Sequence, residues 1–193
     1  MLDRRRVVAA LLADRADRLL VVSGLGAPTW DVAAVGDVDR NFPLWGAMGG
    51  AVMVGLGLAI AQPAARVLVI TGDGEALMGL TSLSTAAGAG VDNLAVVVLD
   101  NERYGETGMQ RTNTAHGTDL AAVAAGCGFD HVTTIETDEE VPVAVELATS
   151  TPGTAFVVAK VAADEPPQVV PPRDGPGLVA RFRRSVVGAA QST

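Results

Sequence analysis

Five short strand-like runs recur along the chain and alternate with segments whose apolar residues have helical spacing. The runs at residues 66–71 and 94–99 are nearly continuous and aliphatic, a pattern typical of strands buried on both faces of a parallel sheet. The alternation predicts an α/β fold, a doubly wound parallel sheet with helices on both faces. The other predicted strands are 19–23, 131–135 and 154–161, and the predicted helices are 2–17, 47–61, 76–89, 118–127 and 139–149.

Polar residues follow the two most apolar runs at the point where each ends. Gly72-Asp73-Gly74 leaves the first run, and Asn101 follows the second. The carboxyl ends of parallel strands meet at one edge of the sheet, so we expect Asp73 and Asn101 to lie on neighbouring strands there. A carboxylate and an amide oxygen suit Mg²⁺, and glycines let backbone N–H groups approach an anion at the start of the next helix. The pattern predicts a Mg²⁺–diphosphate site.

The order of these motifs resembles a known signature. This order resembles the diphosphate-binding domain of thiamin-diphosphate enzymes, in which a Gly-Asp-Gly triplet is followed by a helix, a strand and an asparagine; here these are Gly72-Asp73-Gly74 and Asn101. Residues 41–50 resemble the stretch that holds the cofactor's aminopyrimidine ring in these enzymes, and residues 101–110 resemble the segment that completes the metal site. The amino-acid sequence of residues 99–108 is most similar to that of split sulfopyruvate decarboxylases and of phosphonopyruvate decarboxylase. The resemblance covers roughly residues 20–160.

The resemblance implies roles for individual residues. The Gly46 carbonyl would accept a hydrogen bond from the 4′-amino group, the Met48 amide would meet a ring nitrogen, and the Met48 side chain would wedge between the two rings. The metal ligands would be Asp73, Asn101 and the Arg103 main-chain carbonyl. Met48, Glu106 and His116 are the implied catalytic residues. The full implied cofactor-binding set is Gly26, Gly46, Ala47, Met48, Gly72, Asp73, Gly74, Glu75, Asn101, Arg103, Tyr104, Gly105 and Glu106.

Two residues depart from the family pattern. Glu75 stands where many members carry a small residue, and a carboxylate there repels a diphosphate unless it turns away to cap the helix start or meet an arginine. Asn113 stands where we expect a histidine in a decarboxylase of this subgroup. The substrate therefore stays open, as does the choice between decarboxylation and ligation to a second carbonyl. Arg111 is a candidate for binding a substrate acid group, with a surface charge as the alternative.

The resemblance also implies a partner. In this family the glutamate that activates the aminopyrimidine lies on a separate pyrimidine-binding domain, for which these 193 residues leave no room. We therefore expect a complementary subunit, two of each chain or a multiple, docked on the glycine-rich 46–61 segment and around Trp30 and Trp45. The alternatives are a carboligase subunit, a non-catalytic subunit of the same fold, or a dinucleotide-binding dehydrogenase suggested by the partial glycine motif at 23–29.

The amino-acid composition narrows the class of protein and its possible partners. With 49% hydrophobic and 19% charged residues the chain has the make-up of a folded protein, and a net charge of −8 disfavours nucleic acid and anionic membranes as partners. Residues 44–61 carry no charge, and we expect a buried helix there rather than a membrane span, with Met53 and Met78 in the core. We expect a cytoplasmic protein without a signal peptide. The expected division is a cofactor-binding domain, 1–163, followed by a proline-rich arm and helix, 164–193.

Overall fold

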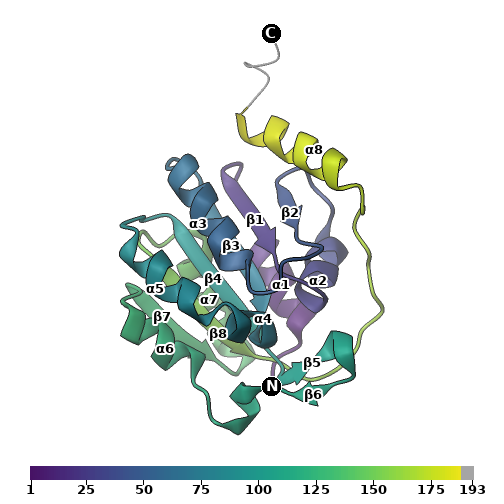
Figure 1. Ribbon diagram of the computed structural model, residues 1–193, viewed down its shortest axis with the longest axis vertical. Helices are drawn as coiled ribbons and strands as arrows, with labels where there is room; N and C mark the ends of the chain where they lie inside the picture. Colours follow the sequence, from purple (N-terminus) through teal and green to yellow (C-terminus); the bar gives the residue numbers. More distant parts are fainter. Residues whose placement is uncertain (188–193) are drawn as a thin grey trace.

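The computed structural model describes residues 1–187 and shows a six-stranded, wholly parallel sheet with the strand order β2-β1-β3-β4-β8-β7 (Figure 1). The central strands β1, β3 and β4 lie close to the predicted runs because these runs are buried on both faces, whereas β7, at the edge, is only partly buried. Their bounds are β1 (Leu19–Ser23), β2 (Asn41–Pro43), β3 (Arg66–Gly72), β4 (Leu94–Asp100), β7 (His131–Ile135) and β8 (Ala155–Lys160).

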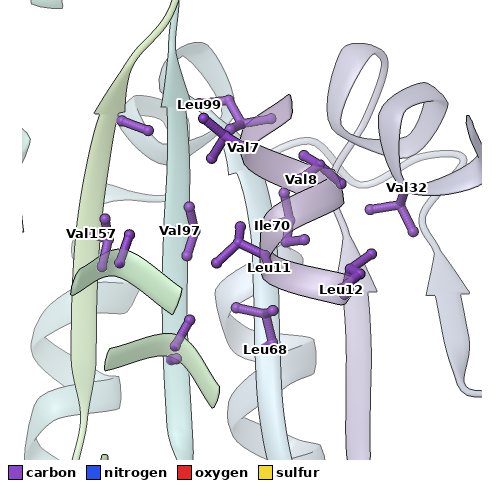
Figure 2. Close-up of a cluster of buried hydrophobic side chains, with 14 of the residues drawn as sticks. Val7, Val8, Leu11, Leu12, Val32, Leu68, Ile70, Val97, Leu99 and Val157 are labelled. Carbon is purple, nitrogen blue, oxygen red and sulfur yellow. The ribbon is translucent and has the colours of Figure 1, made fainter. Parts of the chain in front are cut away.

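Helices cover both faces of this sheet, as predicted. One buried cluster joins the sheet to α1 (Arg4–Leu12), α2 (Ala27–Val35) and α7 (Val141–Thr149). Figure 2 shows this cluster, with Val7 and Leu11 of α1 directed at the strands. On the other face the sheet packs on α3 (Ala51–Ala61), α5 (Leu80–Gly88) and α6 (Leu120–Cys127). The predicted doubly wound α/β architecture is confirmed.

The segment after β1 differs from its prediction. No helix or strand was predicted between residues 24 and 46, but residues 27–35 form α2 and residues 41–43 form the edge strand β2. In the structure Pro28 lies in the first turn, where the missing N–H would have had no intrahelical partner, so a proline is tolerated there.

The single helix predicted at 76–89 is two helices. α4 (Asp73–Met78) ends at Gly79 and α5 begins directly after it. At the break the chain lies in close contact with the 47–50 turn, and only a glycine fits there, because a Cβ at Gly79 would overlap the carbonyl oxygen of Gly49. The same turn delays the helix predicted to begin at residue 47, and α3 begins only at Ala51. Among residues 1–187 no helix is long and apolar enough to cross a membrane.

The carboxyl-terminal part of the described chain is an extended arm followed by a helix. Residues 164–174 have no regular structure and run along the right side of Figure 1 to α8 (Gly175–Val187) at the top. Trp45 donates to the Pro172 carbonyl at 3.1 Å, and the ring of Phe182 in α8 packs 5.0 Å from that of Phe42. That residues 1–163 form a domain of their own stays a prediction.

Candidate active site

A cavity of about 580 Å³ lies at the carboxyl edge of the sheet. The chain leaves β1 toward β2 and leaves β3 toward β4, in opposite directions, and a crevice forms where such connections diverge. Predicted site residues from several parts of the chain meet there. Those that line the cavity are Met48, Gly72, Asp73, Gly74, Glu75, Asn101, Arg103, Tyr104, Gly105 and Glu106.

The amino end of α2 opens onto this cavity. Gly26 precedes the helix with φ +70°, and no side chain caps the first turn. A Cβ at Gly26 would collide with Glu106, which lies over this turn and accepts a hydrogen bond from Trp30 Nε1 at 3.3 Å. Gly26 is therefore required both by its backbone conformation and by this close contact. Pro28 has no N–H and the Trp30 amide donates to the Gly26 carbonyl, so the helix dipole and the amides of Ala27 and Thr29 are what favour an anion at this position.

Asp73 lies at the start of α4 with only 1% of its surface exposed. Its Oδ2 accepts a hydrogen bond from the Thr112 hydroxyl at 2.5 Å, and the Thr114 hydroxyl donates to the neighbouring Asp100 at 2.9 Å. Burial raises the pKa of Asp73 to about 6; the Thr112 hydrogen bond lowers it, and the charge of Asp100 raises it further. A cation beside this carboxylate would stabilise its charged form.

Asn101 shapes the loop that follows β4. Its side-chain oxygen accepts from the Arg103 amide at 3.0 Å, which turns the chain into a small hairpin of β5 (Arg103–Tyr104) and β6 (Gln110–Arg111). The Tyr104 ring packs directly over Gly74. These contacts bring the two halves of the predicted metal site, Asp73 and Asn101, to the wall of one cavity.

Glu75 is buried and its carboxylate turns toward the loop between β1 and α2. Oε2 accepts from the Leu25 amide at 2.9 Å and from the Thr71 hydroxyl at 3.1 Å. Within residues 1–187 Glu75 adopts neither of the two expected arrangements: it does not cap the start of α4 and it pairs with no arginine. Its carboxylate instead braces the chain just before α2. Glu75 thus holds the loop that frames the cavity.

Comparison with known proteins agrees with this geometry. The family described as thiamine pyrophosphate enzyme, C-terminal TPP binding domain, matches residues 36–159. The chain is 36% identical over 191 residues to sulfopyruvate decarboxylase subunit beta of Methanothermobacter thermautotrophicus, covering 99% of each protein. The chain belongs to the thiamine pyrophosphate enzyme family. The resemblance inferred from the motifs is confirmed. The relatives also support the predicted enzyme class, a thiamin-diphosphate-dependent decarboxylase.

Other members of this family show how the domain is used in longer chains. Phosphonopyruvate decarboxylase of Streptomyces hygroscopicus is 39% identical over 147 residues, which are 76% of this chain but 36% of that protein. The solved 4-hydroxybenzoylformate decarboxylase of Rhodococcus jostii RHA1 superposes with a TM-score of 0.71 at 22% identity, over 86% of this chain and 33% of that one. At this identity the superposition shows a shared fold.

Within this family's fold, the stretch resembling the pyrimidine-binding segment lies open. Gly46, Ala47 and Met48 are exposed, Ala47 has φ +58°, and Met48 lines the cavity with 37% of its surface accessible. The expectation that Met53 and Met78 pack in the core is wrong, because both are exposed. The helical spacing of α3 places Met53 on its outer face.

Some predicted residues lie elsewhere, and some contributors were missed. His116 is exposed, and the structure does not bring it to the cavity lining; Asn113 is exposed as well. Sequence reasoning missed the Thr112 and Thr114 hydroxyls, whose alternation around Asn113 was a readable signal. It also missed Arg4 and the arm residues 164–168, which line the cavity and carry no local motif.

Proposed function

We propose that this chain is the catalytic subunit of a split, Mg²⁺-dependent thiamin-diphosphate enzyme that decarboxylates a 2-oxoacid of the sulfopyruvate or phosphonopyruvate type. The observation that carries the proposal is the meeting of Asp73, Asn101 and Met48 around one cavity at the switch point of the sheet. Similarity over the whole chain to a protein named sulfopyruvate decarboxylase subunit beta supports the same reading.

The donor set fits Mg²⁺. Asp73 would contribute one carboxylate, and Asn101 and the Arg103 carbonyl would contribute neutral oxygens, which is the hard-oxygen chemistry that this ion prefers. Among residues 1–187 no cluster of three or more acidic, histidine or cysteine side chains is arranged to hold a metal. Diphosphate oxygens and water would complete the octahedron. The raised pKa of Asp73 reflects a buried charge that such a cation would balance.

The remaining residues would bind and orient the cofactor. The free amides at the start of α2 and those of Tyr104, Gly105 and Glu106 would hold the diphosphate. When bound, thiamin diphosphate supplies the electron sink for loss of carbon dioxide from a 2-oxoacid. Gly46 and Ala47 would face its aminopyrimidine, and the Met48 side chain would hold the two rings in a bent conformation. The proposal does not use His116.

A partner subunit would complete the site. The exposed apolar side chains Met53 and Ile60 of α3 and Met78 at the end of α4 form, with Met48, the α3 surface. Gly57 lies between the first two on the same helix face and leaves open space above it. An apolar surface next to a cavity is costly to leave in water, and a second chain could both cover it and supply the carboxylate that activates the aminopyrimidine. The expected assembly has two of each chain or a multiple.

One alternative reaction is favoured by a specific residue. Asn113 stands where we expect a histidine in the decarboxylase subgroup, and a carboligase of the acetolactate or acyloin type would need no such group. Product analysis separates the two, because decarboxylation releases an aldehyde and ligation forms a hydroxyketone. A non-catalytic subunit would give neither product.

The test is to assay the chain alone and with its partner subunit, using sulfopyruvate and phosphonopyruvate with Mg²⁺ and cofactor. We expect aldehyde formation only from the pair. Full turnover by the isolated chain would mean that the activating carboxylate lies within it. No turnover by the pair with any 2-oxoacid would refute the proposed function.

A further inference from the structure

Two consecutive arginines, one of which lines the cavity, share one buried aspartate. Asp31 of α2 has 0% of its surface exposed. Its Oδ2 lies 2.8 Å from Arg4 Nε, and its Oδ1 accepts from Arg5 Nε at 2.9 Å. A buried ion pair costs desolvation energy that its attraction only partly returns, so it is weak evidence for a purely stabilising role.

The two arginines use their other nitrogens differently. Arg5 donates to the carbonyl of Pro167 and so fastens the arm. Arg4 is 6% exposed and lines the cavity, and within residues 1–187 its two terminal nitrogens donate to no protein acceptor. Those nitrogens are not among the fully buried unpaired atoms, so they keep contact with solvent. Arg4 is among the residues that line the cavity, which is the hollow next to this guanidinium.

The charges around the cavity make this arrangement unusual. Its lining contains five carboxylates and two arginines. Arg103 is the other arginine, and one of its terminal nitrogens donates to the Glu102 carbonyl. Arg4 therefore offers an oriented guanidinium whose fork of N–H groups matches two oxygens of an anion. The carboxylates in the lining are Asp73, Glu75, Glu106, Asp164 and Glu165.

We propose that Arg4 is an anion-binding residue of this cavity, which takes a phosphorus or sulfur oxyanion through its two terminal nitrogens. Asp31 is its positioning residue. The inference rests on the proposed function for the identity of the oxyanion. The acid group is either a phosphate of the bound cofactor or the phosphonate or sulfonate of the substrate, since both present the same tetrahedral oxygens.

The test compares Arg4→Gln and Arg4→Lys with the matched control Arg5→Gln, which removes the neighbouring arginine from the same aspartate. Calorimetry measures the Kd of inorganic pyrophosphate and of thiamin diphosphate, each with Mg²⁺, for the chain with its partner. Kinetics at saturating cofactor measure the KM of sulfopyruvate and of pyruvate, which lacks the second acid group. Circular dichroism and a melting curve establish that each variant folds.

Arg4→Gln should weaken one of the two ligands about tenfold or more, as expected for loss of a hydrogen bond to a charged group. A weaker Kd for pyrophosphate and cofactor assigns Arg4 to the diphosphate. An unchanged cofactor Kd, with a raised KM for sulfopyruvate but not for pyruvate, assigns it to the substrate. Arg4→Lys should retain part of the affinity, because the charge remains while the fork is lost.

The proposal is overturned if folded Arg4→Gln matches Arg5→Gln in both binding and KM. If Arg4→Gln does not fold, the same comparison is made with Arg4→Lys, and equality with Arg5→Gln again overturns it. The pyrophosphate measurement needs no turnover. A pair that binds pyrophosphate through Arg4 but decarboxylates nothing would leave the anion site standing and remove the proposed function.

Discussion

Replacing Asp73 with asparagine should stabilise this protein in the absence of metal. The carboxylate is buried and hydrogen-bonded to Thr112, and burial raises its pKa from 3.8 to about 6. The unfolded chain releases the proton at the lower pH, so ionisation of Asp73 costs folding free energy once the pH exceeds both values. The difference corresponds to about 3 kcal/mol at pH 7. Asp73→Asn should recover a large part of it, since the amide keeps an oxygen for Thr112.

The sign and the pH window of this effect are specific. The pKa of Asp73 is raised on folding, so its contribution to the free energy of unfolding falls as pH rises from about 4 to about 6 and is constant above. Urea unfolding without divalent ions, repeated across pH 4–8, should show this loss in the wild type and not in Asp73→Asn. The difference between the two proteins isolates Asp73 from the other carboxylates.

Asp100→Asn is the matched control because its predicted effect has the opposite sign. Asp100 is equally buried but accepts from Lys160 Nζ at 2.8 Å, so removing its charge leaves that ammonium with Glu102, at 3.2 Å, as its acidic partner. Asp100→Asn should destabilise by about 1–3 kcal/mol. With Mg²⁺ and cofactor the order for Asp73 reverses, since ligand binding should stabilise the wild type and not Asp73→Asn. Equal stability of Asp73→Asn and wild type at pH 7 without metal would refute the reasoning.

Three further substitutions test other parts of the site. Met48→Ala should reduce turnover by the assembled enzyme while costing under about 1 kcal/mol of stability, because the side chain is 37% exposed and leaves no closed cavity; wild-type turnover would refute the wedge role. Glu75→Ser removes the carboxylate that accepts from the Leu25 amide, and calorimetry should show a cofactor-binding free energy weaker by about 1–3 kcal/mol. An unchanged Kd would show that this hydrogen bond is not needed for binding. Ile60→Asp on the exposed face of α3 should change the unfolding free energy of the isolated chain by less than about 0.5 kcal/mol and should abolish co-elution with the partner. Retained co-elution would place the interface elsewhere.

Much of the architecture could be read from the sequence because its causes are local. The runs at 66–71 and 94–99 are apolar at nearly every position, and only a strand covered on both faces buries them all. A helix between two such strands places their carboxyl ends on one edge, so Asp73 and Asn101 could be expected at one site before any coordinates. The glycines around Asp73 and the Met48 turn are likewise short-range signals.

Other features depended on contacts that no local pattern records. The direction of Glu75 is decided by the Leu25 amide, which lies 50 residues earlier in the chain. Gly79 separates two helices in a segment predicted as one, at a point where the 47–50 turn lies in close contact with it.

The clearest case is Arg4, one of three consecutive arginines whose sequence does not distinguish them. Only the folded chain places Asp31 beside Arg4 and Arg4 in the wall of the cavity. The sequence by itself determined which segments are buried and which sheet edge carries the chemistry, because burial follows from residue periodicity and parallel strand direction follows from a helix between two strands. The tertiary structure decided which distant partner each polar side chain meets, because a buried polar group is held by whichever donor or acceptor the packing brings within reach.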